Sequence, residues 1–253
     1  MKIPSNLTWF DNDDYIGLKL AFPAGSTWQL ERKIKESEDL YTQKTSELYK
    51  FTSQARATFV TYKVAGNGPS TAAIKIHMQI PCWETVTKKP SVRAKQADPE
   101  IPYRGSSEVE ALSILTKARC SSAPYLIDWT YRRQNDSEWV PGGYIHFIAM
   151  ELLPGVNVSS IFNSMERRER DNLRSAFKKA WIECMSCGVE HDDTGLQNLL
   201  WDREQHKCYL IDFEHFDTPS SKSVTWRDRN YLAWNLAQAP NFADFDDMST
   251  WIL

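Results

Sequence analysis

Residues 54–80 carry the clearest strand pattern in the chain. Residues 57–64 are rich in threonine, valine and aromatic side chains, and residues 71–80 are almost continuously apolar. β-Branched and aromatic residues favour extended strands. The intervening Gly66-Asn67-Gly68-Pro69 is a turn signal. The pattern predicts a β-hairpin over residues 54–80.

A second pair of apolar segments follows later in the chain. Residues 125–131 and 144–152 have the composition of strands, and the residues between them are polar. Pro154 and Gly155 come directly after the second segment and would end it. We therefore expect two further strands, joined by a turn through residues 135–143.

Two segments have the spacing of amphipathic helices. In residues 165–188, apolar side chains recur at i, i+4, i+7, i+8 and i+11 from Leu173, which places them on one buried face. Residues 106–118 show a shorter apolar stripe, with Ser106 or Ser107 as the expected N-cap. Residues 28–51 are charged with scattered apolar positions, and a helix is expected over part of them.

Residues 81–105 are interpreted as a long loop. The segment contains four prolines, and its basic residues include Lys88, Lys89, Arg93 and Lys95. A loop of this length inside a domain is usually functional or disordered. Basic side chains there could contact a polyanion, and a solvated insertion explains them equally well.

Polar residues of chemical interest concentrate in residues 189–214. His191, Asp193 and Asn198 follow the spacing H-x-D-x-x-x-x-N, and Asp212 comes after the apolar residues 208–211. We expect a polar loop, a short strand at 199–201, a turn and a second strand before Asp212. One such polar residue would be explained by a turn alone. Four in this register favour a catalytic loop.

The residue types suit metal-assisted transfer to a hydroxyl group. Asn198 and Asp212 carry hard oxygen donors of the kind that Mg²⁺ prefers. Asp193 supplies a carboxylate that can accept a proton from the attacking hydroxyl. His191 would brace the loop.

Lys75 is a lone cation inside the apolar residues 71–80. Burying it without a partner would be costly, so a buried Lys75 would need a charged ligand or neighbour. The alternative is that Lys75 faces solvent from an alternating strand. His77 lies on the same face, and we assign it a structural role.

Composition permits an ordinary globular core. The chain has 253 residues, with 42% hydrophobic and 25% charged, which suits one two-lobed domain or two small ones. The net charge of −3 gives no general attraction to nucleic acid or membranes. Residues 1–105 hold 15 Lys and Arg against 11 Asp and Glu, so this part is mildly basic and could face phosphates.

The five cysteines predict reduced thiols. Their number is odd, the N-terminal residues show no apolar signal region, and no apolar run approaches a membrane-spanning length. We therefore expect a cytoplasmic location and no membrane partner. Cys184 and Cys187 form a single C-x-x-C on the predicted helix, for which a core role is favoured over zinc binding.

Residues 55–215 resemble the protein-kinase-like fold, and in particular fungal-type small-molecule phosphotransferases related to the aminoglycoside and choline enzymes. The resemblance is carried by Ala-Ala-Ile-Lys-Ile-His-Met-Gln-Ile-Pro, Met-Glu-Leu-Leu-Pro-Gly-Val, Ala-Phe-Lys-Lys-Ala-Trp-Ile-Glu-Cys, Asn-Leu-Leu-Trp-Asp and Tyr-Leu-Ile-Asp-Phe-Glu. It implies an α+β, two-lobed fold. An N-terminal antiparallel sheet plus helix would occupy residues 1–153, and a shortened, mostly helical C-terminal lobe residues 154–253.

The resemblance also implies an ATP- and Mg²⁺-dependent site. Lys75 would hold the α- and β-phosphates and pair with Glu108, for which Glu110 is the competing choice. Met150 would lie near the adenine, with Leu152 in the interlobe linker. Asp193 would act as base, and Asn198 and Asp212 as metal ligands. The acceptor would be a small molecule.

Three departures from the family pattern matter. Residues 26–65 contain no glycine, so a glycine-rich phosphate loop before Lys75 is missing or built otherwise. Glu214 stands where protein kinases have glycine. An Ala-Pro-Glu segment is absent from the sequence, and 41 residues follow Asp212. A kinase that phosphorylates peptides is therefore not expected.

Two other functions remain open. The chain also resembles, more weakly, fungal arginine-containing cyclodipeptide synthases, which use aminoacyl-tRNA in place of ATP. Asp192 and Asp193 would then be catalytic, as part of an acidic D-D-x-x-E motif that lacks its glutamate here, and tRNA would contact the basic residues 88–95. The last candidate is a catalytically inactive binding module, against which the intact Asp193, Asn198 and Asp212 argue.

Overall fold

The computed structural model describes residues 7–219 and 225–253. Contacts between Cα atoms divide the chain into two compact units. The first comprises Met1–Gly105 with Ile127–Leu152, and the second comprises Ser106–Leu126 with Leu153–Leu253. The units are thus interleaved along the sequence, whereas the expected lobes, 1–153 and 154–253, were consecutive segments.

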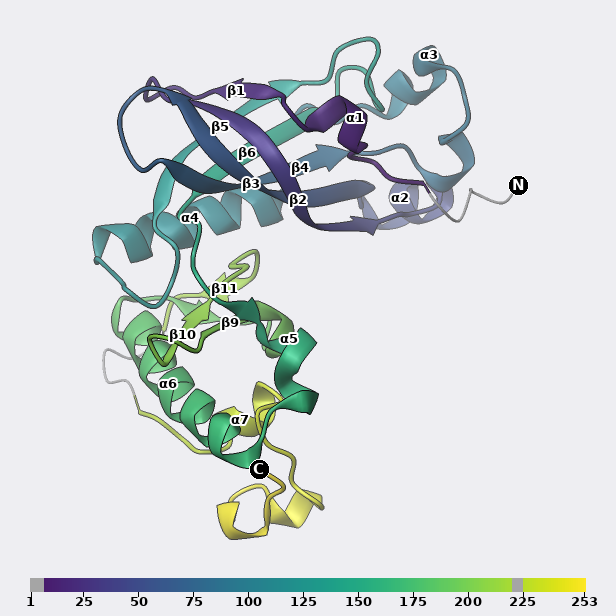
Figure 1. Cartoon of the computed structure of the whole chain (residues 1–253). Helices are drawn as coiled ribbons and strands as arrows, with labels where there is room; N and C mark the ends of the chain where they lie inside the picture. The colour runs from purple at the N-terminus through teal and green to yellow at the C-terminus, as the bar shows by residue number, and fades with distance from the viewer. Residues whose placement is uncertain (1–6, 220–224) are drawn as a thin grey trace. The chain divides into compact units, whose positions relative to one another are not determined.

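A six-stranded sheet forms the first unit (Figure 1). Its strand order is β1-β2-β3-β4-β6-β5, and the pairs from β1 to β4 and between β4 and β6 are antiparallel. The strands are β1 (Lys19–Ala21), β2 (Thr27–Asp39), β3 (Gln54–Ala65), β4 (Thr71–Gln79), β5 (Leu126–Arg133) and β6 (Tyr144–Met150). The hairpin predicted over residues 54–80 is confirmed as β3 and β4, and the later pair as β5 and β6.

Strand β4 lies inside the sheet and carries much of the core. All of its residues after Thr71 are buried, β3 and β6 pair with its two edges, and one face, with Ala72, Ile74, Ile76 and Met78, lies in the hydrophobic core. The interior position explains the nearly continuous apolar run in the sequence. Lys75 is only 6% exposed, so the alternative that it faces solvent is wrong. His77 is fully buried.

Strand β2 replaces most of the segment in which partial helix was expected. Only α2 (Gln43–Tyr49) is helical between residues 28 and 51. The pairing of β2 with β3 shifts register at three places, between Thr27 and Trp28, between Leu30 and Arg32, and between Lys33 and Lys35. These irregularities break the strict alternation of buried and exposed positions, which is the sequence signal for a strand.

Residues 81–105 contain short helices, where a loop was expected. They are η1 (Trp83–Thr85), α3 (Pro90–Arg93) and η2 (Ala94–Gln96). Gln96 ties them together, since its side chain donates to the Thr85 hydroxyl over 2.7 Å and accepts from the Cys82 amide over 2.8 Å. Lys88 and Lys89 are exposed.

Helix α6 is the longest element of the second unit. It spans Arg167–Ser186, and its buried face includes the five apolar residues predicted from the sequence, from Leu173 to Cys184. Helix α4 (Tyr103–Lys117) enters this unit at Ser106. Because α4 begins at Tyr103, the prediction of Ser106 or Ser107 as its N-cap is wrong.

Two small sheets complete the second unit. One has the order β10-β9-β7 and comprises β7 (Val156–Asn157), β9 (Leu199–Asp202) and β10 (Lys207–Leu210). The other pairs β8 (Glu190–His191) with β11 (Phe216–Asp217). The short helices of this unit are α5 (Val158–Ile161), η3 (Phe162–Ser164), η4 (Leu196–Asn198), α7 (Asn230–Ala233), η5 (Phe242–Asp244) and η6 (Met248–Thr250). The first unit also contains α1 (Asn12–Tyr15). The α+β class is confirmed, with a sheet-based first unit and helices in the second.

Among the described residues, no helix is long and apolar enough to cross a bilayer.

Candidate functional site

Two loops of the second unit are fastened to each other through their backbones. The first follows β8 and leads to β9, and the second follows β10 and leads to β11. β8 pairs antiparallel with β11, with His191 opposite Phe216. The Asp192 amide donates to the carbonyl of His215 over 3.1 Å, and the Ile211 amide donates to the carbonyl of Asn198 over 3.0 Å. The predicted order of loop, strand, turn and strand is thereby confirmed.

His191 links the two loops from inside the unit. Its ring is 4% exposed and contacts the rings of Phe213 and Trp234, with centroid separations of 4.7 and 5.2 Å. Nε2 lies 2.9 Å from the carbonyl oxygen of Ile211, which can only accept a hydrogen bond, so Nε2 carries the proton. Burial lowers the pKa of His191 below its ordinary value. The residue therefore positions the backbone before Asp212 through this hydrogen bond.

Asn198 and Asp193 are joined directly. The Asn198 side-chain nitrogen donates to the backbone oxygen of Asp193 over 2.8 Å and to its carboxylate Oδ2 over 2.9 Å. Asn198 is 1% exposed, at the end of η4, and Asp193 is exposed. A buried amide thus orients an accessible carboxylate through one of its two oxygens.

The other end of the Asn198 amide can accept a ligand. Its Oδ1 is buried and receives no hydrogen bond from the described residues. A buried amide oxygen of this kind is costly unless it is paired. Because amide oxygens are good ligands for hard cations, the donor set of Asn198 and Asp212 fits Mg²⁺.

Asp212 adopts a backbone conformation that is uncommon for residues other than glycine. Its φ angle is +67°, in the left-handed region. Such conformations are maintained only where the surrounding structure determines them, and they are frequent at functional sites. The carboxylate is half-buried and close enough to His191 to raise that ring's pKa in opposition to burial.

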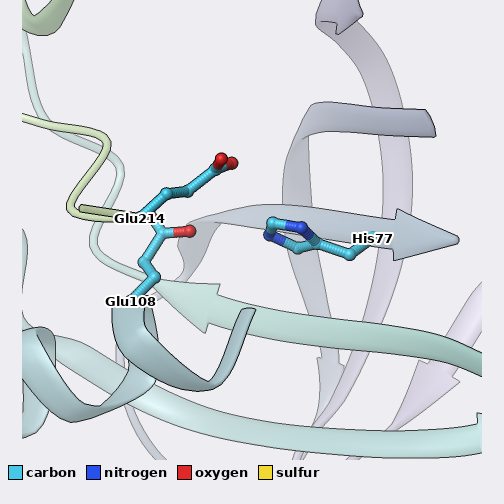
Figure 2. A group of neighbouring side chains, drawn as sticks. All are labelled: His77, Glu108 and Glu214. Atoms are coloured by element: carbon cyan, nitrogen blue, oxygen red, sulfur yellow. The ribbon is translucent and has the colours of Figure 1, made fainter. Parts of the chain in front are cut away.

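Two buried carboxylates accompany this loop pair. Glu108 of α4 and Glu214, two residues after Asp212, are 1% and 6% exposed. One oxygen of each lies within 4.8 Å of the other, and Figure 2 shows their side chains next to each other. Of the two glutamates considered for α4, Glu108 is buried and Glu110 is exposed.

The remaining predicted site residues belong to the first unit. Lys75 lies in the middle of β4 and opposite Ile148 of β6. Met150 is the last residue of β6 and is 8% exposed, and Leu152 is half-buried. The loop pair therefore brings His191, Asp192, Asp193, Asn198 and Asp212 together, whereas Lys75, Met150 and Leu152 are positioned by the sheet.

Glu214 is a buried polar residue of this loop pair that the sequence did not single out as part of a site. The sequence signal was its place in Asp-Phe-Glu, directly after an apolar strand, where glycine was the expected residue. Asp192, by contrast, is exposed beside Asp193, and its backbone amide bonds the second loop.

No protein-family model and no curated protein matches the sequence. Two solved structures of kinases are similar in backbone. For PK-1 kinase of the Cydia pomonella granulovirus, the TM-score is 0.43 and the identity 10%, covering 77% of this chain and 53% of that one. For vaccinia related kinase 3, the TM-score is 0.44 and the identity 14%, covering 83% and 55%. The chain spans about half the length of these structures.

Proposed function

We propose that the chain is a kinase-like phosphotransferase that moves the terminal phosphoryl group of ATP to a hydroxyl group of a small molecule. The observation that carries this proposal is the Asn198 side chain. Its nitrogen orients the Asp193 carboxylate, and its buried oxygen has no partner among the described residues. One amide thus serves both a base and a cation site.

Each residue of the loop pair has a part in this chemistry. Asp193 accepts the proton of the acceptor hydroxyl, for which its exposed position is suited. Asn198 and Asp212 hold Mg²⁺, and His191 keeps the backbone before Asp212 in place through its bond to Ile211. Bound Mg²⁺ would neutralise charge on the phosphoryl oxygens.

The first unit supplies the nucleotide-binding residues in this proposal. Lys75 binds the α- and β-phosphates, and its burial inside β4 would fix the direction of its ammonium group. Met150 and Leu152 contact the adenine. A small acceptor is favoured over a peptide because Glu214 stands where protein kinases have glycine.

Thermal stability in the presence of nucleotide tests the proposal. A ligand at ten times its dissociation constant stabilises the folded state by about 1.4 kcal/mol, which raises the melting temperature of a chain of this size by roughly 3–5 °C. Mg²⁺-ATP should produce such a shift, and ATP with EDTA a smaller one. Absence of any shift up to millimolar Mg²⁺-ATP would contradict nucleotide binding.

A tRNA-dependent cyclodipeptide synthase is the second candidate. It is favoured by the exposed Lys88 and Lys89 in the basic segment, and by the second exposed carboxylate at Asp192. This function predicts retention of aminoacyl-tRNA that weakens steeply with salt, with no response to ATP. A rise in melting temperature with Mg²⁺-ATP, without turnover of any acceptor, would instead indicate a binding module.

A further inference from the structure

Three cysteines gather at the end of α6, away from the residues assigned to phosphoryl transfer. Cys184 lies in the last turn of the helix, Cys187 is its C-cap residue, and Cys120 follows α4. The Sγ atoms of Cys120 and Cys184 are 3.7 Å apart. A disulfide bond would bring the two sulfur atoms to ~2.05 Å.

The segment that carries Cys120 is fastened to α6 by other contacts. The Ser121 amide and hydroxyl donate to the Glu183 carboxylate over 2.7 and 3.1 Å, and the Ser122 hydroxyl donates to the same group. The Ser122 carbonyl accepts from the Leu210 amide over 2.9 Å, which joins the segment to β10 as well. The two sulfur atoms are therefore held together by neighbours that do not depend on the thiols.

The two thiols differ in accessibility and acidity. Cys120 is partly exposed, and a hydrogen bond from Cys184 lowers the pKa of its thiol. Cys184 is 1% exposed, and the same hydrogen bond together with burial raises the pKa of its thiol. Thiolates, rather than thiols, react with peroxides. The pair thus has one reactive member and one protected member.

We propose that Cys120 and Cys184 are an oxidisable pair that forms a reversible disulfide on exposure to hydrogen peroxide. The Cys120 thiolate attacks one peroxide oxygen, so that the O–O bond breaks, a sulfenic acid forms and hydroxide leaves. The Cys184 sulfur then attacks the Cys120 sulfur, the S–O bond breaks, and the Cys184 proton leaves with the hydroxyl group as water. The two sulfurs lose two electrons, and the peroxide gains them.

The disulfide bond would lie close in sequence to β8 and to the first loop of the pair, which follows it. The Val189 amide donates to the Cys184 carbonyl over 3.1 Å, and His191 follows two residues later. A bond from Cys184 to Cys120 would therefore fix the end of α6 to the segment after α4, next to the start of this loop.

Peptide mapping after peroxide treatment of the full chain tests the proposal. Trypsin would release peptide 120–132 and peptide 180–203, which contains both Cys184 and Cys187. The expected product is these two peptides joined, with the mass of two hydrogens lost, and separated again by dithiothreitol. Two of the five thiols should disappear from a thiol titration of the denatured protein.

Single substitutions identify the partner. Cys187→Ser should retain the joined peptides, and Cys120→Ser should abolish them and leave all of its thiols titratable. Cys82→Ser, in the first unit, is the matched control and should behave as the wild type. Loss of the link in Cys187→Ser, or oxidation of Cys120 to a sulfinic acid with no linked peptide, would overturn the proposal. The proposal would also be overturned if the purified protein contained one equivalent of Zn²⁺ that protects Cys120, Cys184 and Cys187 from oxidation.

Discussion

The side-chain nitrogen of Asn198 donates to both the backbone and the carboxylate of Asp193, at 2.8 and 2.9 Å. This relationship spans five residues, so the spacing H-x-D-x-x-x-x-N is also a geometric requirement. A shorter or longer loop would move the amide away from the carboxylate that it orients. The spacing therefore bears directly on reactivity.

Asp193→Asn should remove turnover and leave the fold intact. General base catalysis contributes on the order of 10²–10⁴ in rate, and the exposed side chain supports no buried packing. Steady-state phosphorylation of the acceptor gives the rate, and circular dichroism checks the fold. Asp217→Asn, at an exposed position of β11, is the matched control. Unchanged turnover in Asp193→Asn would remove the residue from the role of base.

Asp192→Asn distinguishes the two candidate enzymes. In the proposed phosphoryl transfer the exposed Asp192 side chain has no role, so this variant should keep most of its phosphotransferase rate. Cyclodipeptide synthesis would need both neighbouring carboxylates. A loss as large as that of Asp193→Asn, measured with aminoacyl-tRNA as donor, would favour the second candidate.

Asn198→Ala should change both stability and metal dependence. Two hydrogen bonds are lost, each worth about 0.5–1.5 kcal/mol, so the free energy of unfolding should fall by about 1–3 kcal/mol. The Mg²⁺ concentration for half-maximal rate should rise at least about tenfold, which one lost ligand explains. Urea unfolding and a Mg²⁺ titration measure the two effects. Asn172→Ala, on the exposed face of α6, should change unfolding by less than about 0.5 kcal/mol.

Asp212→Asn should weaken metal binding without the loss of folding stability that is expected for Asn198→Ala. The substitution keeps the size and one oxygen donor of the side chain but removes its charge. We therefore expect the Mg²⁺ titration to move to higher concentration while the urea midpoint changes little. If the Mg²⁺ titration were superimposable on the wild type, Asp212 could not be a ligand.

Lys75→Met should raise the dissociation constant for Mg²⁺-ATP. A charge-assisted hydrogen bond to phosphate is worth about 1.5–3 kcal/mol, which corresponds to roughly a 10–150-fold change. Methionine preserves the length and the apolar stem of the buried side chain, so β4 should retain its packing. Isothermal titration with Mg²⁺-ATP gives the affinity. Lys44→Met, on the exposed side of α2, should bind as the wild type does.

His146 should make the first unit sensitive to acid. It is fully buried opposite His77, and burial lowers its pKa from 6.5 to about 3. The unfolded chain binds a proton there below pH 6.5 while the folded chain does not, so stability is complete above that pH and decreases as the pH falls towards 3.

The slope for one such group is about 1.36 kcal/mol per pH unit, or about 2 kcal/mol between pH 6.5 and 5. Urea unfolding at these two pH values measures the loss in the wild type. In His146→Leu, the difference between the two pH values should shrink by about that amount. An equal pH dependence in both proteins would show that His146 is not the group that titrates.

The sequence predicted those elements in which periodicity and burial agree. Helix α6 and the β3–β4 hairpin were identified because their apolar residues keep one period throughout. Strand β2 was missed because its bulges interrupt the alternation, and the helices of residues 81–105 because they are only three or four residues long.

For the site, the spacing of His191, Asp193 and Asn198 was sufficient to predict that they lie close together. The burial of Glu214 was not predictable, because a single glutamate after a strand is compatible with either a solvent-facing or an interior position. The same applied to Lys75, which could have faced solvent from an alternating strand. Only the burial of Lys75 in the folded sheet decided the question.

The interleaving of the two units limits how the chain can be divided. The polypeptide passes between them at three points, after Gly105, Leu126 and Leu152. A fragment that starts at Leu153 would therefore lose Glu108 and Cys120, which lie in the separate segment Ser106–Leu126. Expression of the second unit on its own would need that segment fused to it. A single proteolytic cut after Leu126 would divide both units, whereas a cut after Gly105 would divide the first unit alone and a cut after Leu152 the second unit alone.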